Sequence, residues 1–179
     1  MVLIVISGSA GAGKTTVAKH LAKKFKLRYF SAGNYFRELA KKHGFEDFIK
    51  WHEYVERHPE IDRKVDNRVK REAKKGNVVI EGWIAGHVVK KADLKIFLRV
   101  PLKVAAKRIA KREEVSLRKA LEHTKRRERY TKRYLKEYGI DFNDLSPYHV
   151  VMDTSIWDME ENKKIIEYIV KTLLRRDKK

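Results

Sequence analysis

The stretch Gly8-Ser-Ala-Gly-Ala-Gly13-Lys14-Thr15 decides the fold of this 179-residue chain. It fits the pattern G-x-x-x-x-G-K-[ST], which is typical of loops that bind phosphate groups. It directly follows a run of β-branched and aliphatic residues at 2–6 and opens a helical pattern at 15–25. A glycine-rich turn without a ligand is the alternative, but the strand, loop and helix occur in the order that a phosphate-binding loop needs.

The residue types of this loop are suited to holding an anion. Gly8, Gly11 and Gly13 let the backbone curl so that successive N–H groups converge at the N-terminus of a helix, whose dipole favours negative charge. Lys14 can reach the β- and γ-phosphates of a nucleoside triphosphate, and the Thr15 hydroxyl can ligate Mg²⁺. The residues expected to bind the triphosphate are Gly8, Ser9, Ala10, Gly11, Ala12, Gly13, Lys14, Thr15 and Thr16.

Composition limits the class of protein. The chain has 43 Lys and Arg against 24 Asp and Glu, a net charge of +19, with 42% hydrophobic residues and no cysteine. The lack of cysteine excludes disulfides, thiolate metal sites and cysteine nucleophiles. The length and hydrophobic content favour a single domain over residues 1–179. Because no apolar run approaches the roughly 20 residues needed to span a bilayer, we expect a cytoplasmic protein without a membrane partner.

Short β-branched runs alternate with helical patterns along the rest of the chain. The runs lie at 28–30, 78–80, 94–98 and 150–152, and the helical patterns at 33–43, 46–57, 59–75, 102–112, 116–138 and 159–174. This alternation predicts an α/β fold with a central, parallel, five-stranded sheet flanked by helices. In the segment 116–138 the apolar stripe fades after Thr124 into arginine and tyrosine, which predicts a less buried and mobile helix.

Two further features lie where ligands bind in such a sheet. Glu81 and Gly82 follow the run 78–80, and a carboxylate at that strand end could hold Mg²⁺ through water, although a helix cap or a surface acid is the alternative. Residues 103–136 carry 14 Lys and Arg against four Glu. Most of these belong by default to a solvated face, but arginines on one face can neutralise a moving phosphoryl group. Such a segment could close over two phosphate chains and exclude water.

Together these features resemble the nucleoside monophosphate (NMP) kinases, and most closely the archaeal cytidylate kinases. The resemblance covers nearly the whole chain and also rests on Ser31-Ala-Gly-Asn-Tyr-Phe-Arg37-Glu-Leu-Ala, Pro59-Glu-Ile-Asp62, Glu81-Gly-Trp-Ile-Ala-Gly86, Tyr138-Gly-Ile-Asp141 and Val151-Met-Asp-Thr-Ser-Ile-Trp157. It implies a P-loop kinase fold with an NMP-binding helical flap at 33–75 and a basic lid at about 113–140. The implied activity is direct transfer of the γ-phosphoryl group of ATP, with Mg²⁺, to CMP or dCMP in pyrimidine metabolism.

The resemblance also implies roles for single residues. Arg37 would hold the acceptor phosphate, and Arg127 and Arg133 would act with Lys14 in catalysis by neutralising the transferred group. Arg108 would lie against the adenine of ATP, and Arg112 would approach its phosphates. The other substrate-binding positions would be Ser31, Gly33 and Gly82, and the metal positions would be Thr15 and Glu81.

Departures from the family pattern bear on the choice of base. Bacterial cytidylate kinases place a serine before the glycine equivalent to Gly33, whereas this chain has Ala32 there and Ser31 adjacent. Trp83 fits either the core or a nucleotide pocket. A kinase of AMP, UMP or another small acceptor is therefore the alternative, and an RNA-associated P-loop ATPase is a second one. The chain has no aromatic–basic RNA-binding signature, so we expect no nucleic-acid partner. We also expect a monomer.

Overall fold

The centre of the molecule is a five-stranded sheet in the order β2-β3-β1-β4-β5. A computed structural model describes residues 1–176, and every neighbouring pair of strands in its sheet is parallel. The strands are β1 (Leu3–Gly8), β2 (Arg28–Ser31), β3 (Val78–Glu81), β4 (Leu94–Arg99) and β5 (Val150–Asp153). The predicted α/β fold with a parallel five-stranded sheet is therefore confirmed.

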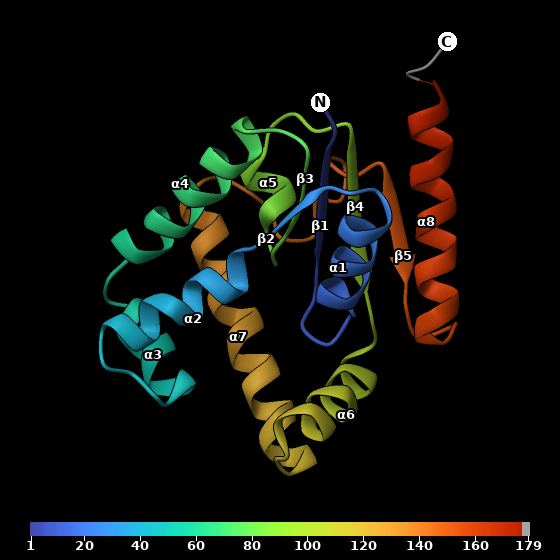
Figure 1. Cartoon of the computed structure of the whole chain (residues 1–179). Coiled ribbons are helices and arrows are strands. Elements are labelled where there is room, and N and C mark those ends of the chain that lie inside the picture. The colour runs from blue at the N-terminus through green and yellow to red at the C-terminus, as the bar shows by residue number, and fades with distance from the viewer. Residues whose placement is uncertain (177–179) are drawn as a thin grey trace.

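Helices cover both faces of the sheet and extend beyond one of its ends (Figure 1). They are α1 (Lys14–Lys24), α2 (Ala32–Lys42), α3 (Phe48–Val55), α4 (Glu60–Lys74), α5 (Ala85–Val88), α6 (Leu102–Glu113), α7 (Leu117–Glu137) and α8 (Met159–Arg176). Figure 1 shows α2, α3, α6 and α7 around the end of the sheet from which α1 begins. Among the helices in residues 1–176, only α5 has no counterpart in the predicted pattern, because four residues are too few to show a helical period.

The core has one cluster on each face of the sheet, as alternating side chains of a covered strand require. Ile4 and Ile6 of β1 are buried in a cluster with residues of α1 and α8, whereas Val5 between them packs in a second cluster with residues of α4 and α5. No helix in the described residues is long and apolar enough to cross a membrane.

A buried carboxylate joins β2 to α4. Glu72 accepts a 2.7 Å hydrogen bond from Arg28 of β2, and it forms ion pairs with Arg68 at 3.1 Å and Lys75 at 2.8 Å. Arg28 also donates to the carbonyl oxygen of Gly76 at 3.0 Å, where the backbone leaves α4 with φ +62°. The Glu72 network therefore connects the end of a helix to an edge strand.

The second half of α7 differs from the prediction for residues 116–138. Thr131, Tyr134 and Leu135 are buried, so the prediction that this part is less buried is wrong. The Tyr134 hydroxyl donates a 2.6 Å hydrogen bond to Asp66 of α4. The polar residues that interrupt the apolar stripe are thus the surface by which α7 packs on α4.

Candidate active site

The phosphate-binding loop connects β1 to α1, as the sequence predicts. Gly11 and Gly13 have φ values of +73° and +83°, a conformation that L side chains rarely adopt. The Lys14 ammonium group lies across the loop and donates a 2.7 Å hydrogen bond to the carbonyl oxygen of Ser9. Burial lowers the pKa of Lys14 to about 8, against the opposing effect of Glu81, and nearby guanidinium groups lower it further.

Glu81 lies at the end of β3, directly beside this loop. Its side chain is buried, and Oε1 accepts hydrogen bonds from Ser31 at 2.5 Å, Thr15 at 3.1 Å and Tyr29 at 3.2 Å. The sequence predicts that Glu81 and Thr15 share a site, and the structure brings them together. The sequence did not indicate that Tyr29 belongs to this site, because a tyrosine in a short edge strand gives no signal of its hydrogen-bond partner.

Three arginines from different elements lie near enough to Lys14 to affect its pKa. Arg127 of α7, Arg112 of α6 and Arg37 of α2 are the guanidinium groups that lower the pKa of the Lys14 ammonium group. Burial, together with Arg37 and Arg112, lowers the pKa of Arg127 to about 10. Positive charge therefore accumulates where the three helices converge on the loop.

Aromatic faces hold two of these arginines. The Arg127 guanidinium carbon lies 4.8 Å from the ring centre of Trp83, and that of Arg37 lies 5.2 Å from the ring centre of Phe48. Within residues 1–176, no carboxylate forms a salt bridge with Arg127 or Arg37. A preorganised cationic cluster in which two arginines form no salt bridge suits a polyanionic ligand.

The structure does not place Arg133 in the cationic cluster. Its side chain is exposed and donates a 3.4 Å hydrogen bond to the carbonyl oxygen of Glu56. Six residues separate Arg127 from Arg133, which is a rotation of about 240° around an α-helix. The two arginines therefore cannot both face the phosphate-binding loop.

Arg108 connects the phosphate-binding loop to the loop after β5. It donates hydrogen bonds to the carbonyl oxygen of Gly11 at 3.1 Å, and to the hydroxyl and carbonyl oxygens of Thr154 at 3.1 and 2.8 Å. Arg112 lies one turn further along α6, is exposed and pairs with Glu113. Arg108 is thus fixed by the loops that the resemblance associates with ATP.

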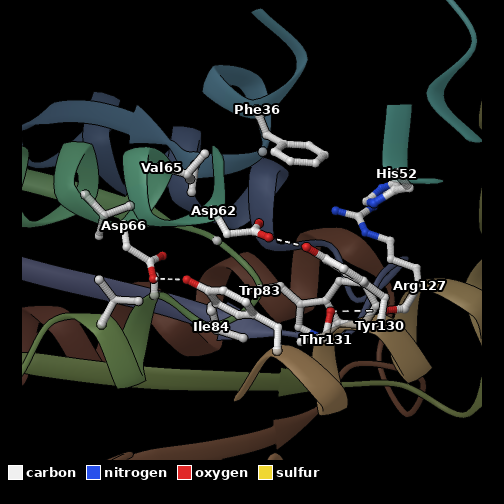
Figure 2. A pocket seen from close by; sticks show the side chains of 17 residues that line it. Phe36, His52, Asp62, Val65, Asp66, Trp83, Ile84, Arg127, Tyr130 and Thr131 are labelled. Carbon is white, nitrogen blue, oxygen red and sulfur yellow. Dashed lines mark hydrogen bonds between the residues drawn. The ribbon is translucent and has the colours of Figure 1, made fainter. Parts of the chain in front are cut away.

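A pocket of about 100 Å³ lies beside the cationic cluster, between the loop after β3 and helices α2, α4 and α7 (Figure 2). Gly33, Gly82 and Trp83 line it, and the first two are among the residues that the resemblance assigns to substrate binding. Ser31 does not line it, because its hydroxyl bonds to Glu81 and caps α2 by accepting from the Asn34 N–H at 3.1 Å. Ser31 therefore supports the helix that forms one wall of the pocket.

Two aspartates in this pocket were missed by sequence reasoning. Asp62 and Asp66 of α4 accept hydrogen bonds from Tyr130 and Tyr134 of α7, respectively. Burial raises the pKa of both carboxyl groups, that of Asp62 to about 7, and the tyrosine hydrogen bonds oppose the effect. Asp62 ends one of the stretches on which the resemblance rests, and both pairs repeat at a spacing of four residues, but neither signal gives an aspartate its partner.

Residues 3–156 match the cytidylate kinase-like family. The chain belongs to that family. It is 49% identical over 161 residues to the cytidylate kinase of Pyrococcus horikoshii, covering 88% of this chain and 82% of that protein. It is 43% identical over 176 residues to the cytidylate kinase of Pyrobaculum islandicum, covering 97% and 95%.

Solved structures support the same fold for this member of the cytidylate kinase-like family. An uncharacterized protein from Eubacterium ventriosum aligns with a TM-score of 0.70 at 20% identity, covering 96% of this chain and 99% of that one. Shikimate kinase from Acinetobacter baumannii aligns with a TM-score of 0.60 at 17% identity, covering 100% and 96%. At these identities the likeness concerns the fold alone.

Proposed function

We propose that this chain transfers the γ-phosphoryl group of ATP to the 5′-phosphate of CMP or dCMP, giving ADP and CDP or dCDP. The observation that carries the proposal is the cluster of Lys14, Arg37, Arg112 and Arg127 between the phosphate-binding loop and the adjoining pocket. Within residues 1–176, Arg37 and Arg127 of this cluster form no salt bridge. Relatives named cytidylate kinase over most of the chain supply the acceptor.

In this proposal each part of the cluster acts on a different phosphate. The loop N–H groups and Lys14 hold the β- and γ-phosphates of ATP, and Arg37 holds the acceptor phosphate at the entrance of the pocket. Arg127 lies between them and neutralises the charge on the transferred group. The acceptor phosphate is already ionised at neutral pH, so the reaction needs no general base, and catalysis consists of positioning and charge neutralisation.

The residues near the loop fit a Mg²⁺ ion held mainly by nucleotide phosphates and water. The described residues contain no group of three His, Cys, Asp or Glu side chains that could form a protein cage for a metal. Thr15 donates its hydroxyl proton to Glu81 Oε1, which leaves its oxygen lone pairs for a cation and Glu81 Oε2 for a metal-bound water. When bound, Mg²⁺ neutralises negative charge on the β- and γ-phosphates.

We further propose that residues 33–75 form the acceptor-binding flap and about 113–140 the lid of a single domain over 1–179. The Arg126–Glu53 ion pair at 2.8 Å and the tyrosine–aspartate pairs join these two segments. Opening of the lid to admit substrates would break these contacts. We also propose that the protein is a monomer and is cytoplasmic.

A steady-state panel of CMP, dCMP, UMP, AMP and GMP with ATP and Mg²⁺ tests the proposal. We expect kcat/KM for CMP or dCMP to exceed that for the other acceptors by at least about tenfold. Lys14→Ala is the matched control, because it removes the ammonium group that contacts the β- and γ-phosphates and should abolish all turnover. A preference for AMP or UMP would contradict the proposal.

A further inference from the structure

Two carboxylates one turn apart form a polar wall in the otherwise largely apolar pocket. Figure 2 shows Asp62 and Asp66 extending from α4, each joined by a dashed line to a tyrosine of α7. In each pair the tyrosine bonds to Oδ2, and within residues 1–176 neither Oδ1 takes part in a hydrogen bond or salt bridge. Each aspartate therefore keeps one oxygen that can accept a hydrogen bond from a ligand.

The order of residues along α7 sets the direction in which an acceptor nucleotide lies. Arg127, Tyr130 and Tyr134 all line the pocket. Seven residues of α-helix, from Arg127 to Tyr134, span about 10 Å. That length is comparable with the extent of a pyrimidine nucleoside monophosphate.

Charge determines at which end of the pocket, along α7, the acceptor phosphate lies. Arg127 belongs to the cationic cluster, so the acceptor phosphate lies at its level. Asp66, which bonds to Tyr134, lies on the side of the pocket away from Arg127 (Figure 2). A nucleotide bound in this direction has its ribose at the level of Asp62 and the edge of its base at the level of Asp66.

We propose, resting on the function proposed above, that the Asp66 carboxylate accepts a hydrogen bond from the exocyclic 4-amino group of cytosine and thereby selects cytosine over uracil. In its ionised form, which the Tyr134 hydrogen bond favours against the effect of burial, the Asp66 carboxyl group can only accept hydrogen bonds, and an amino group donates them. Uracil has a carbonyl oxygen at the same position, so two acceptors would face each other in a buried site. Leaving buried polar groups unpaired in this way is how a site rejects the wrong substrate.

Asp66→Asn tests the proposal, because asparagine has the same shape and adds a donor that can pair with the uracil carbonyl. We expect the ratio of kcat/KM for CMP to that for UMP to fall by about 10- to 100-fold, with kcat/KM for UMP rising in absolute terms. Asp62→Asn is the matched control: the same chemical change, one turn away on the same helix. It should lower kcat/KM for both substrates by the same factor and leave their ratio unchanged.

Two further measurements separate direct recognition from a structural role. Tyr134→Phe removes the same contact between α4 and α7 but leaves the Asp66 carboxylate, so it should lower kcat/KM for both substrates without changing their ratio. The unmodified enzyme can also be given the monophosphate of a pyrimidin-2-one ribonucleoside, which carries hydrogen in place of the amino group. Its kcat/KM should fall between those for CMP and UMP, a result that requires no variant to fold.

Three results would overturn the proposal. They are an unchanged CMP to UMP ratio in Asp66→Asn, a ratio changed equally by Tyr134→Phe or Asp62→Asn, and equal use of CMP and the pyrimidin-2-one nucleotide. Failure of the proposed function would look different, because the unmodified protein would then not phosphorylate CMP in the same assay.

Discussion

Replacing Arg127 with methionine should make the protein more stable and almost inactive. Burial, with Arg37 and Arg112, lowers the pKa of Arg127 from 12.5 to about 10. One pKa unit corresponds to about 1.4 kcal/mol, so at pH 7 the folded state carries about 3 kcal/mol of unfavourable free energy from this charge. The penalty is present below the folded pKa and disappears as pH rises through the range between the two values.

Methionine removes this penalty and keeps a long apolar side chain against Trp83. The lost contact between guanidinium and ring, at 4.8 Å, offsets about 1 kcal/mol of the gain. The net stabilisation is about 2 kcal/mol, which for a chain of this size raises Tm by about 4–8 °C. At the same time kcat should fall by about 10²–10³-fold, because a preorganised cation is missing from the transition state.

Thermal unfolding without ligands and steady-state kinetics with CMP and ATP measure the two effects on the same preparation. Arg127→Lys is the matched control, since it keeps the charge and should therefore show no comparable rise in Tm. A lower Tm for Arg127→Met would refute the electrostatic reasoning. A kcat within tenfold of the unmodified enzyme would remove Arg127 from the catalytic step.

Three other predictions concern the loop, its neighbours and the core. With a pKa of about 8, Lys14 loses its proton as pH rises, so kcat/KM for ATP should fall about tenfold per pH unit above 8; a flat profile to pH 9.5 would contradict this. Ser31→Ala removes a helix cap and a bond to Glu81, and should cost about 1 kcal/mol of stability in denaturant titration without changing the CMP to UMP ratio. Gly86→Ala places a Cβ 2.3 Å from the ring of Tyr148, so thermal unfolding should show a loss of about 1–3 kcal/mol, whereas an unchanged Tm would mean that the ring moves freely.

The parts of the site that adjoin the phosphate-binding loop could be predicted from the sequence. The loop motif fixes the end of β1, the parallel sheet places the ends of neighbouring strands at one edge, and Glu81 follows directly from that geometry. The proximity of Glu81 to Thr15 therefore needed no knowledge of how helices pack.

The pocket could not be predicted in the same way. Its Asp66–Tyr134 pair joins residues 68 positions apart, and helical periodicity defines a face without identifying the helix that covers it. The tyrosines of α7 looked like exposed polar residues because their partners are carboxylates rather than apolar groups. The choice between Arg127 and Arg133 likewise depended on which side of α7 meets the loop.

The Glu72 network makes the stability of the acceptor flap dependent on temperature in an unusual direction. Removing charged groups from water becomes less costly on heating, whereas apolar burial per unit area reaches a plateau. Arg28, Arg68 and Lys75 all share the Glu72 carboxylate. The contribution of these ion pairs to stability therefore grows on heating, relative to that of the apolar core. A Glu72→Gln protein should therefore unfold at nearly the same rate as the parent near room temperature. As the temperature approaches Tm, the variant should unfold progressively faster than the parent.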